Sequence, residues 1–269
     1  MVVLHDFFNM YFMGSVEIIF GFYFFVRILN KKIRFYFYLL FAVCVVGIIH
    51  FIPSGIVGLG LFVLLLAAGG ILICHADGKL SVLYAILVVG MMQLSYGIVK
   101  SLLSMFYPML SFWDQHIVGT AFMLSGYIAS LTLAGICYHI VWKYFSNFEA
   151  VEKQYLFLLL IPILMICIMD EYINSFIYGS VVTDVNGVTV YTNHYQMLIM
   201  QLLGMISMFC ILYAYKKLLM NFLLSTELSL LEQEEHSMNQ YVEEAKAHYE
   251  KTKSLRHDLK NDIGVIKNV

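Results

Sequence analysis

Residues Leu80 to Val99 have the sequence LSVLYAILVVGMMQLSYGIV, which contains no charged side chain and is bounded by Lys79 and Lys100. About 20 apolar residues in a helix cross the roughly 30 Å of hydrocarbon in a lipid bilayer. A shorter apolar run would fit a buried helix of a soluble domain, whereas this one has the length of a membrane span. The stretch therefore predicts a transmembrane helix.

The composition of the whole chain agrees with this prediction. Of its 269 residues, 61% are hydrophobic and 13% are charged, whereas soluble domains contain roughly 45–50% apolar and about 25% charged residues. The net charge is only −2, and the chain contains no basic stripe with interleaved aromatic residues of the kind that binds nucleic acid. The composition excludes an ordinary soluble enzyme and a nucleic-acid-binding protein, and it makes membrane lipid an expected partner.

Seven windows in the first four fifths of the chain are long and apolar enough to be membrane spans. We therefore expect an all-α fold, with a polytopic membrane bundle of about seven transmembrane helices followed by a long cytoplasmic dimerisation helix. No cleavable signal peptide is expected, because the N-terminus lacks a basic region. The predicted spans are Phe8 to Ile28, Phe35 to Ile52, Ile56 to Cys74, Leu80 to Val99, Ile117 to Trp142, Tyr155 to Ile173 and Tyr195 to Tyr215.

The distribution of basic residues predicts the orientation of the spans. Lys and Arg are retained on the cytoplasmic side of a membrane. One set of connections contains nine basic residues, and the opposite set contains only Lys100. We expect a multi-pass protein with its N-terminus outside and its C-terminus in the cytoplasm, which requires an odd number of spans. The nine residues are Arg27, Lys31, Lys32, Arg34, Lys79, Lys143, Lys153, Lys216 and Lys217.

The outer connection from Asn174 to His194 has the pattern of a β-hairpin. Alternating Val and Thr residues flank the pair Asn186 and Gly187. An Asn-Gly pair favours a type I′ turn, because both central positions of that turn need a positive φ. We therefore expect two short antiparallel strands between the sixth and seventh spans.

Four ionisable residues in or directly next to the predicted spans are candidates for an outward-facing ligand site. A charged group in hydrocarbon costs about 2.5–3.5 kcal/mol on insertion scales, so each needs a partner or a function. Glu17, Lys100, Asp170 and Glu171 are these candidates, with Gln93 near them. The alternative is that the pair at 170 and 171 reaches the membrane surface, and that Glu17 is neutral or hydrogen-bonded to a neighbouring helix.

We expect no metal site. Five histidines lie mostly at the ends of the predicted spans, and no two of them have the spacing of paired ligands on one helix. All five cysteines lie within apolar spans without a CxxC pair, which is typical of small buried apolar residues.

The composition changes abruptly after Lys217, and neither Pro nor Gly occurs again before Gly264. We divide the chain into a membrane sensor domain at 1–217, a helical linker at 218–253 and a further helical segment at 254–269. Spacings of three and four residues in the linker favour a two-stranded coiled coil, hence a homodimer. A single amphipathic helix lying on the membrane would have similar spacings, although its acidic face would be repelled by anionic headgroups. The apolar or small residues are Leu224, Leu231, Met238, Tyr241 and Ala245.

The last segment contains a pattern suited to phosphoryl transfer. Leu255 and its apolar neighbours share one helix face, which leaves His257 on the opposite, solvated face. Asp258 is able to take the proton that His257 loses when it attacks a phosphorus atom, and Asn261 follows one turn later. The apolar face continues through Leu259, Ile263 and Ile266.

The run Leu255-Arg256-His257-Asp258-Leu259-Lys260-Asn261 resembles the H-box of the AgrC-like peptide-sensing histidine kinases of Gram-positive bacteria, which carry GHKL-type ATPase domains. The resemblance in sequence covers about 14 residues, and that of the membrane part is one of layout. It implies a quorum-sensing receptor in a bacterial cell membrane that detects a secreted peptide or small molecule and signals to a cytoplasmic response regulator. By this resemblance, His257 is the phosphorylated residue, Asp258 is its acid/base neighbour, and Asn261 serves in phosphotransfer or dephosphorylation.

The chain departs from this family at its C-terminal end. It stops within the first helix of the phosphoacceptor bundle, and it contains no sequence for binding ATP and Mg²⁺. We therefore expect ATP and Mg²⁺ only for a missing C-terminal domain, and no kinase activity from this chain alone. The alternative function is a non-catalytic membrane scaffold that heterodimerises with an intact kinase and modulates it.

Overall fold

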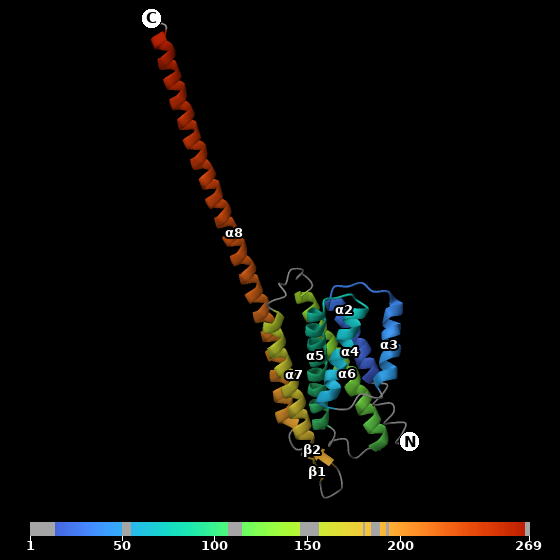
Figure 1. Ribbon diagram of the computed structural model, residues 1–269. Helices are drawn as coiled ribbons and strands as arrows, with labels where there is room; N and C mark the ends of the chain where they lie inside the picture. Colours follow the sequence, from blue (N-terminus) through green and yellow to red (C-terminus); the bar gives the residue numbers. More distant parts are fainter. Residues whose placement is uncertain are drawn as a thin grey trace. The chain divides into compact units, whose positions relative to one another are not determined.

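The computed structural model describes residues 14–49, 55–106, 115–145, 156–179, 181–183, 189–191 and 194–266. By its internal contacts the chain divides into a first unit, Met1–Tyr215, and a second unit, Lys216–Val269. The elements, labelled as in Figure 1, are α2 (Gly14–Ile28), α3 (Phe35–Ile49), α4 (Ile56–Leu72), α5 (Gly78–Phe106), α6 (Gln115–Phe145), α7 (Leu156–Gly179), β1 (Val181–Thr183), β2 (Thr189–Tyr191) and α8 (His194–Ile266).

Each of the seven predicted spans coincides with one of these seven helices, so the all-α bundle is confirmed. The number of crossings is a different matter. Among the described residues, three helices are long and apolar enough to cross a membrane: Gly78–Phe106, Met123–Lys143 and the helix that begins at His194. The apolar helices α3 and α4 have 15 and 17 residues, which is less than the roughly 20 of a typical span. The three long helices indicate a membrane protein without requiring seven crossings.

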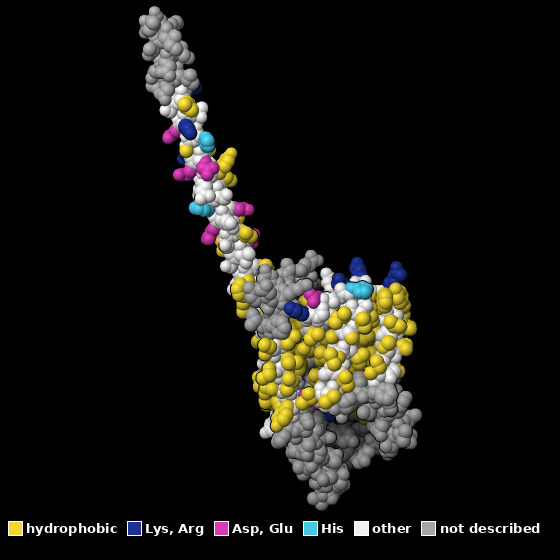
Figure 2. All heavy atoms as spheres, in the orientation of Figure 1, with side chains coloured by type: hydrophobic (Ala, Val, Ile, Leu, Met, Phe, Trp, Pro, Cys, Tyr) yellow, Lys and Arg dark blue, Asp and Glu magenta, His cyan; other side chains and the backbone are white. Residues whose placement is uncertain are grey.

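The surface of the first unit is apolar over much of its height. Large hydrophobic side chains are exposed along several helices, for example Phe35 and Val43 on α3, Leu64 on α4 and Ile128 on α6. Figure 2 shows them as a continuous band around the visible face of the bundle. A soluble monomer rarely exposes an apolar patch of more than a few hundred Å². In a bilayer the same side chains contact lipid tails, and the helical backbone needs no water to satisfy its hydrogen bonds.

Helix α5 lies at the centre of the bundle and contacts α2, α4, α6 and α7. Its neighbours run in alternating directions. Gly21 of α2 lies beside Val88 and Gly204 of α8 beside Leu94, and the Tyr138 hydroxyl of α6 donates to the Val88 carbonyl oxygen at 2.7 Å. Farther along α5, Tyr96 lies near Glu17 of α2 and Tyr127 of α6, and Gly97 lies beside Gln201 of α8, so the residue numbers on these three helices fall as those of α5 rise. On α7 they rise together, because Cys167 lies beside Gly90 and Glu171 bonds to Gln93. Neighbours in sequence are therefore antiparallel, as short connections require.

Glycines on α4 let aromatic side chains of α2 and α3 pack directly against the α4 backbone. The rings of Phe22 and Phe41 stack with centroids 3.8 Å apart, and both rings lie against Gly69. A Cβ atom on Gly70 would lie 2.6 Å from the Phe25 ring and 2.8 Å from the Ser81 hydroxyl oxygen. Lipid tails give no hydrophobic driving force for association between helices. Small residues at the interface therefore matter, because they let the helices pack closely.

The predicted hairpin is present. Strands β1 and β2 pair antiparallel, with Val181 opposite Tyr191, Val182 opposite Val190 and Thr183 opposite Thr189. The Asn186-Gly187 turn lies outside the described residues. This hairpin connects α7 to α8.

Helix α8 continues without interruption through the end of the seventh predicted span to Ile266. From residue 220 to residue 256 every side chain is exposed. Over these residues α8 is a single helix with its apolar side chains uncovered.

The fit at Gly70 gives a first prediction. Gly70→Ala places a methyl group against Phe25 and Ser81, both fully buried, so we expect a loss of roughly 1–3 kcal/mol of stability from overpacking. The measurement is thermal unfolding of the purified chain in detergent micelles. The control is Gly60→Ala on the same helix, where no atom lies within 4 Å of the added carbon. Equal melting temperatures for the two variants would contradict the proposed packing.

Candidate functional site

Polar side chains form a stripe along the C-terminal half of α5. Relative to Gln93 at position i, Tyr96, Lys100 and Ser101 stand at i+3, i+7 and i+8, with Gly97 at i+4. They therefore share one helix face. The preceding part of α5, from Leu83 to Met91, is buried and almost entirely apolar. The polar groups of α5 thus gather near one end of the bundle.

The middle of this stripe faces α2 and α6. The ring centroids of Tyr96 and Tyr127 are 5.9 Å apart. The Glu17 carboxyl group lies close enough to both tyrosines, and to Tyr138, to act on them electrostatically. The Lys100 ammonium lies 5.6 Å from the centre of the Tyr96 ring, within the range of a cation–π contact. Tyr96 and Tyr127 thus join the predicted site residues Glu17 and Lys100 in one cluster.

Glu171 reaches the same face of α5 from α7. The Gln93 amide nitrogen donates a hydrogen bond to the Glu171 carboxylate at 2.7 Å, whereas the Gln93 amide oxygen is buried and has no hydrogen-bond partner among the described residues. The other carboxylate oxygen lies 3.9 Å from where a Cβ would stand on Gly55, the N-cap of α4. Glu171 therefore links α4, α5 and α7.

A second polar link joins α5 to α8. Gln201 is 1% exposed, and its amide oxygen accepts a hydrogen bond from the Ser101 hydroxyl at 3.0 Å. Its amide group lies directly against Gly97, where a larger residue would collide with it. Gln201 is thereby fixed between two positions of the α5 stripe.

The candidate ligand residues are therefore only partly brought together. Glu17 and Lys100 meet at Tyr96, and Glu171 joins through Gln93. Asp170 is buried on α7 and takes part in interactions of its own. Tyr96, Tyr127 and Gln201 were not singled out from the sequence, because neutral polar residues do not stand out in an apolar window. The i, i+3, i+4 spacing of the polar residues on α5 was the signal that would have found the stripe.

The opposite end of the bundle is basic. The Arg27 guanidinium lies 4.2 Å from the centre of the Trp142 ring, which brings the C-terminal ends of α2 and α6 together. Figure 2 shows Lys and Arg side chains along this edge of the apolar band. In the described part of the first unit, the basic residues at this end are Arg27, Lys31, Lys32, Arg34, Lys79 and Lys143, against Lys100 at the other end.

The phosphoacceptor candidates belong to the last turns of α8. The backbone of His257, Asp258 and Asn261 is helical, while their side chains lie outside the described part of the structure. Arg256, directly before them, is exposed.

Among the residues that the structure describes, no three His, Cys, Asp or Glu side chains form a group that could hold a metal ion. Comparisons of the chain with protein-family models, curated proteins and solved structures find no match.

The contact between Gln93 and Glu171 gives a second prediction. Gln93→Leu leaves a partly buried carboxyl group without its donor, and Glu171→Leu leaves the amide without its acceptor, so each is expected to cost about 1–3 kcal/mol. The double variant should lose less than the sum, since neither partner is then left unpaired. The measurement is the unfolding midpoint of the wild type and of each variant in the same detergent. Glu171→Gln, which keeps the size and a hydrogen bond, should lose least; strictly additive losses would contradict the link.

Proposed function

We propose that this chain is the membrane receptor part of a bacterial sensor histidine kinase. In this proposal an extracellular signal, most simply a secreted peptide, binds the outer end of the bundle and changes phosphorylation of His257. ATP and Mg²⁺ bind a catalytic domain outside this chain, and a cytoplasmic response regulator receives the phosphoryl group. The observation that carries the proposal is that α8 extends as one helix from the apolar bundle to the Arg256-His257-Asp258 sequence.

The proposed topology has seven crossings, with the N-terminus outside. It is supported by the alternating direction of the helices and by the basic residues at one end of the bundle, since Lys and Arg are retained on the cytoplasmic side. The short helices α3 and α4 are accommodated by local thinning of the bilayer or by their interfacial side chains. The polar end of α5 then faces outward.

The proposed signal site is the cluster of Glu17, Tyr96, Lys100 and Tyr127, with Glu171 and Asp170 on its α7 side. It offers a carboxyl group, an ammonium group and two aromatic rings within one group of neighbouring side chains. Such a combination suits a peptide, which presents charged termini and amide groups. Binding shifts the receptor between two states only to the extent that the ligand prefers one of them.

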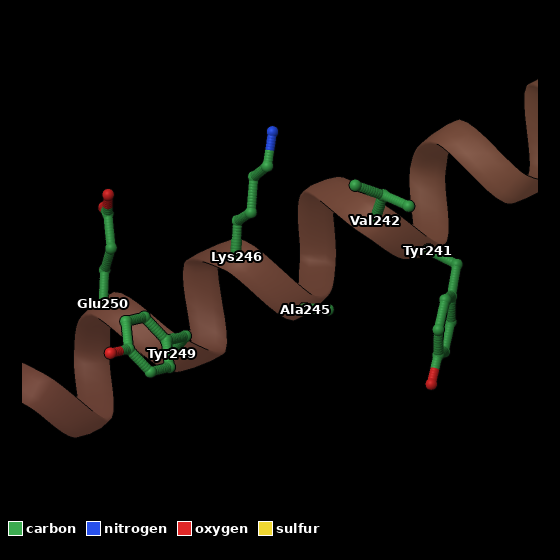
Figure 3. A pocket seen from close by; sticks show the side chains of 6 residues that line it. All are labelled: Tyr241, Val242, Ala245, Lys246, Tyr249 and Glu250. Carbon is green, nitrogen blue, oxygen red and sulfur yellow. The ribbon is translucent and has the colours of Figure 1, made fainter.

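The exposed apolar side chains of the second unit favour a homodimer. Leu224, Leu231, Met238 and Ala245 recur every seven residues, which is the repeat of a two-stranded coiled coil. Figure 3 shows the shallow groove near the end of this row, with Tyr241 and Tyr249 on one side and Lys246 and Glu250 on the other. A groove between two rows of side chains is where the residues of a facing helix insert.

The direct test is phosphate labelling of the native protein in permeabilised cells of its own organism with [γ-³²P]ATP. We expect an acid-labile, base-stable label that is lost in His257→Gln, because phosphohistidine has that stability and His257 is the proposed acceptor. His248→Gln on the same helix should keep the label. A label that survives His257→Gln, or no label at all, would contradict the kinase function.

The same assay tests the outer site with conditioned medium as the source of signal. Glu17→Gln and Lys100→Gln should shift the dose dependence of labelling at unchanged protein level. Asp77→Asn, at the basic end, serves as the control. Identical dose curves would rule out Glu17 and Lys100 as ligand contacts.

A non-catalytic scaffold that pairs with an intact kinase is the alternative, and cross-linking separates it from a homodimer. In a chain freed of its native cysteines, Leu231→Cys should form a disulfide-linked dimer of this chain on mild oxidation, since it lies on the seven-residue row. Ser229→Cys, on another face of the helix, should not. Cross-linking of Leu231→Cys only to a longer protein would favour the scaffold.

A further inference from the structure

The connection between α2 and α3 has a defined backbone conformation. The Lys31 amide donates to the Val26 carbonyl oxygen at 3.3 Å, and the Asn30 amide donates to the Arg27 carbonyl oxygen at 3.1 Å. Asn30 has a φ of 53°, the left-handed conformation that Asn tolerates better than most residues. This pair of hydrogen bonds is the Schellman motif, which ends a helix at a defined residue. The chain therefore leaves α2 in a fixed direction.

Three cations lie in the segment 31–34, which has no regular secondary structure. Lys31, Lys32 and Arg34 are exposed, while Ile33 between them is half-buried and packs against the core. Ile33 thus anchors the segment to the bundle and leaves the three charges on its surface. In the described part of the first unit, Asp77 is the one carboxylate near this end, and it caps the backbone of Lys79.

An exposed apolar row begins directly after the cations. Phe35 is 80% exposed, and Leu39, Val43 and Val46 continue the same side of α3 at helical spacing. Among the described helices, α3 makes its principal contacts with α2, so this row is not covered by protein within one chain. Three cations thus stand at the end of an apolar strip about as long as the helix.

We propose that Lys31, Lys32 and Arg34, together with the Phe35–Leu39–Val43 row, form a binding site for an anionic phospholipid. The cations bind the phosphate and the acidic headgroup, and one acyl chain lies along the row on α3. Charge complementarity commits the site to a lipid with net negative charge, because a zwitterionic headgroup offsets its phosphate with its own cation. The proposal does not depend on the kinase function.

The test is native mass spectrometry of the purified chain with an equimolar mixture of dioleoyl phosphatidylglycerol and dioleoyl phosphatidylcholine. The wild-type chain should retain phosphatidylglycerol preferentially. Each of Lys31→Gln, Lys32→Gln and Arg34→Gln should weaken that binding about fivefold at low ionic strength, as expected for one cation near an anionic lipid. The triple variant should show no preference. Equal retention of both lipids by the wild type, or unchanged preference in the triple variant, would overturn the site.

Three further arms distinguish lipid binding at this site from general attraction to positive charge and from binding of free phosphate. Removing the same charge from α8 with Lys246→Gln, Lys251→Gln and Lys253→Gln should leave the preference intact. Phe35→Ala with Leu39→Ala should weaken retention of phosphatidylglycerol, because the acyl chain loses its contact. Soluble glycerol phosphate should not displace the lipid; displacement would instead indicate a site for free phosphate. Each single variant should have the same melting temperature as the wild type in lipid-free detergent. Misfolding is then excluded as the cause of its weaker lipid binding.

Discussion

Every backbone amide and carbonyl group in hydrocarbon needs a partner within the protein, and the rest of the first unit depends on this constraint. It restricts the apolar windows to helices, and it explains why the two strands of the described part of the chain, β1 and β2, lie in the connection between α7 and α8. It also explains the distribution of apolar residues. Because the helices satisfy their own backbone, their outer faces are free to carry exposed Phe, Leu and Val side chains, which a soluble protein of this size would have to bury.

Packing between the helices then has to come from shape and from polar links rather than from the exclusion of water. Helix α5 shows both. The Tyr138 hydroxyl bonds to its backbone at Val88, Gln93 bonds to Glu171, and Ser101 bonds to Gln201. These three links hold α6, α7 and α8 at defined heights along α5, while Gly90 and Gly97 admit side chains from α7 and α8. Gln93 and Ser101, which supply two of these links, belong to the stripe that also faces the candidate ligand residues. In the proposed function, one set of side chains would therefore serve both stability and recognition.

The sequence predicts the features that local chemistry determines. Apolar windows locate all seven helices, and the pair Asn186-Gly187 predicts the strands that flank it. The ends of helices are less predictable: α5 continues past Lys100 to Phe106, and the Lys100 ammonium group lies 5.6 Å from the centre of the Tyr96 ring of the same helix. The hydrogen bonds between helices are even harder to predict from the sequence. Gln93 and Glu171 are 78 residues apart, and Ser101 and Gln201 are 100 residues apart, so neither pairing follows from spacing on one helix. Glu17 was identified by its charge, whereas its tyrosine neighbours are neutral and do not stand out.

Helix α8 is the element that connects the proposed signal site in the bundle to His257 in the proposed mechanism. An isolated helix is marginal in water and derives most of its stability from packing an apolar face, yet the apolar side chains of residues 220–256 are exposed in a single chain. A partner helix would cover them, and a coiled coil fixes the rotation of each helix about its axis. Between Gly204 and Gly264 the sequence contains no glycine or proline, the residues at which helices most readily bend. In the proposed mechanism, a change in how Gln201 contacts Gly97 and Ser101 is passed on through this continuous helix as a rotation or an axial shift. In the proposed homodimer, such a movement would alter which residues meet in the coiled coil. The proposal connects the buried amide of Gln201 to His257 in this way.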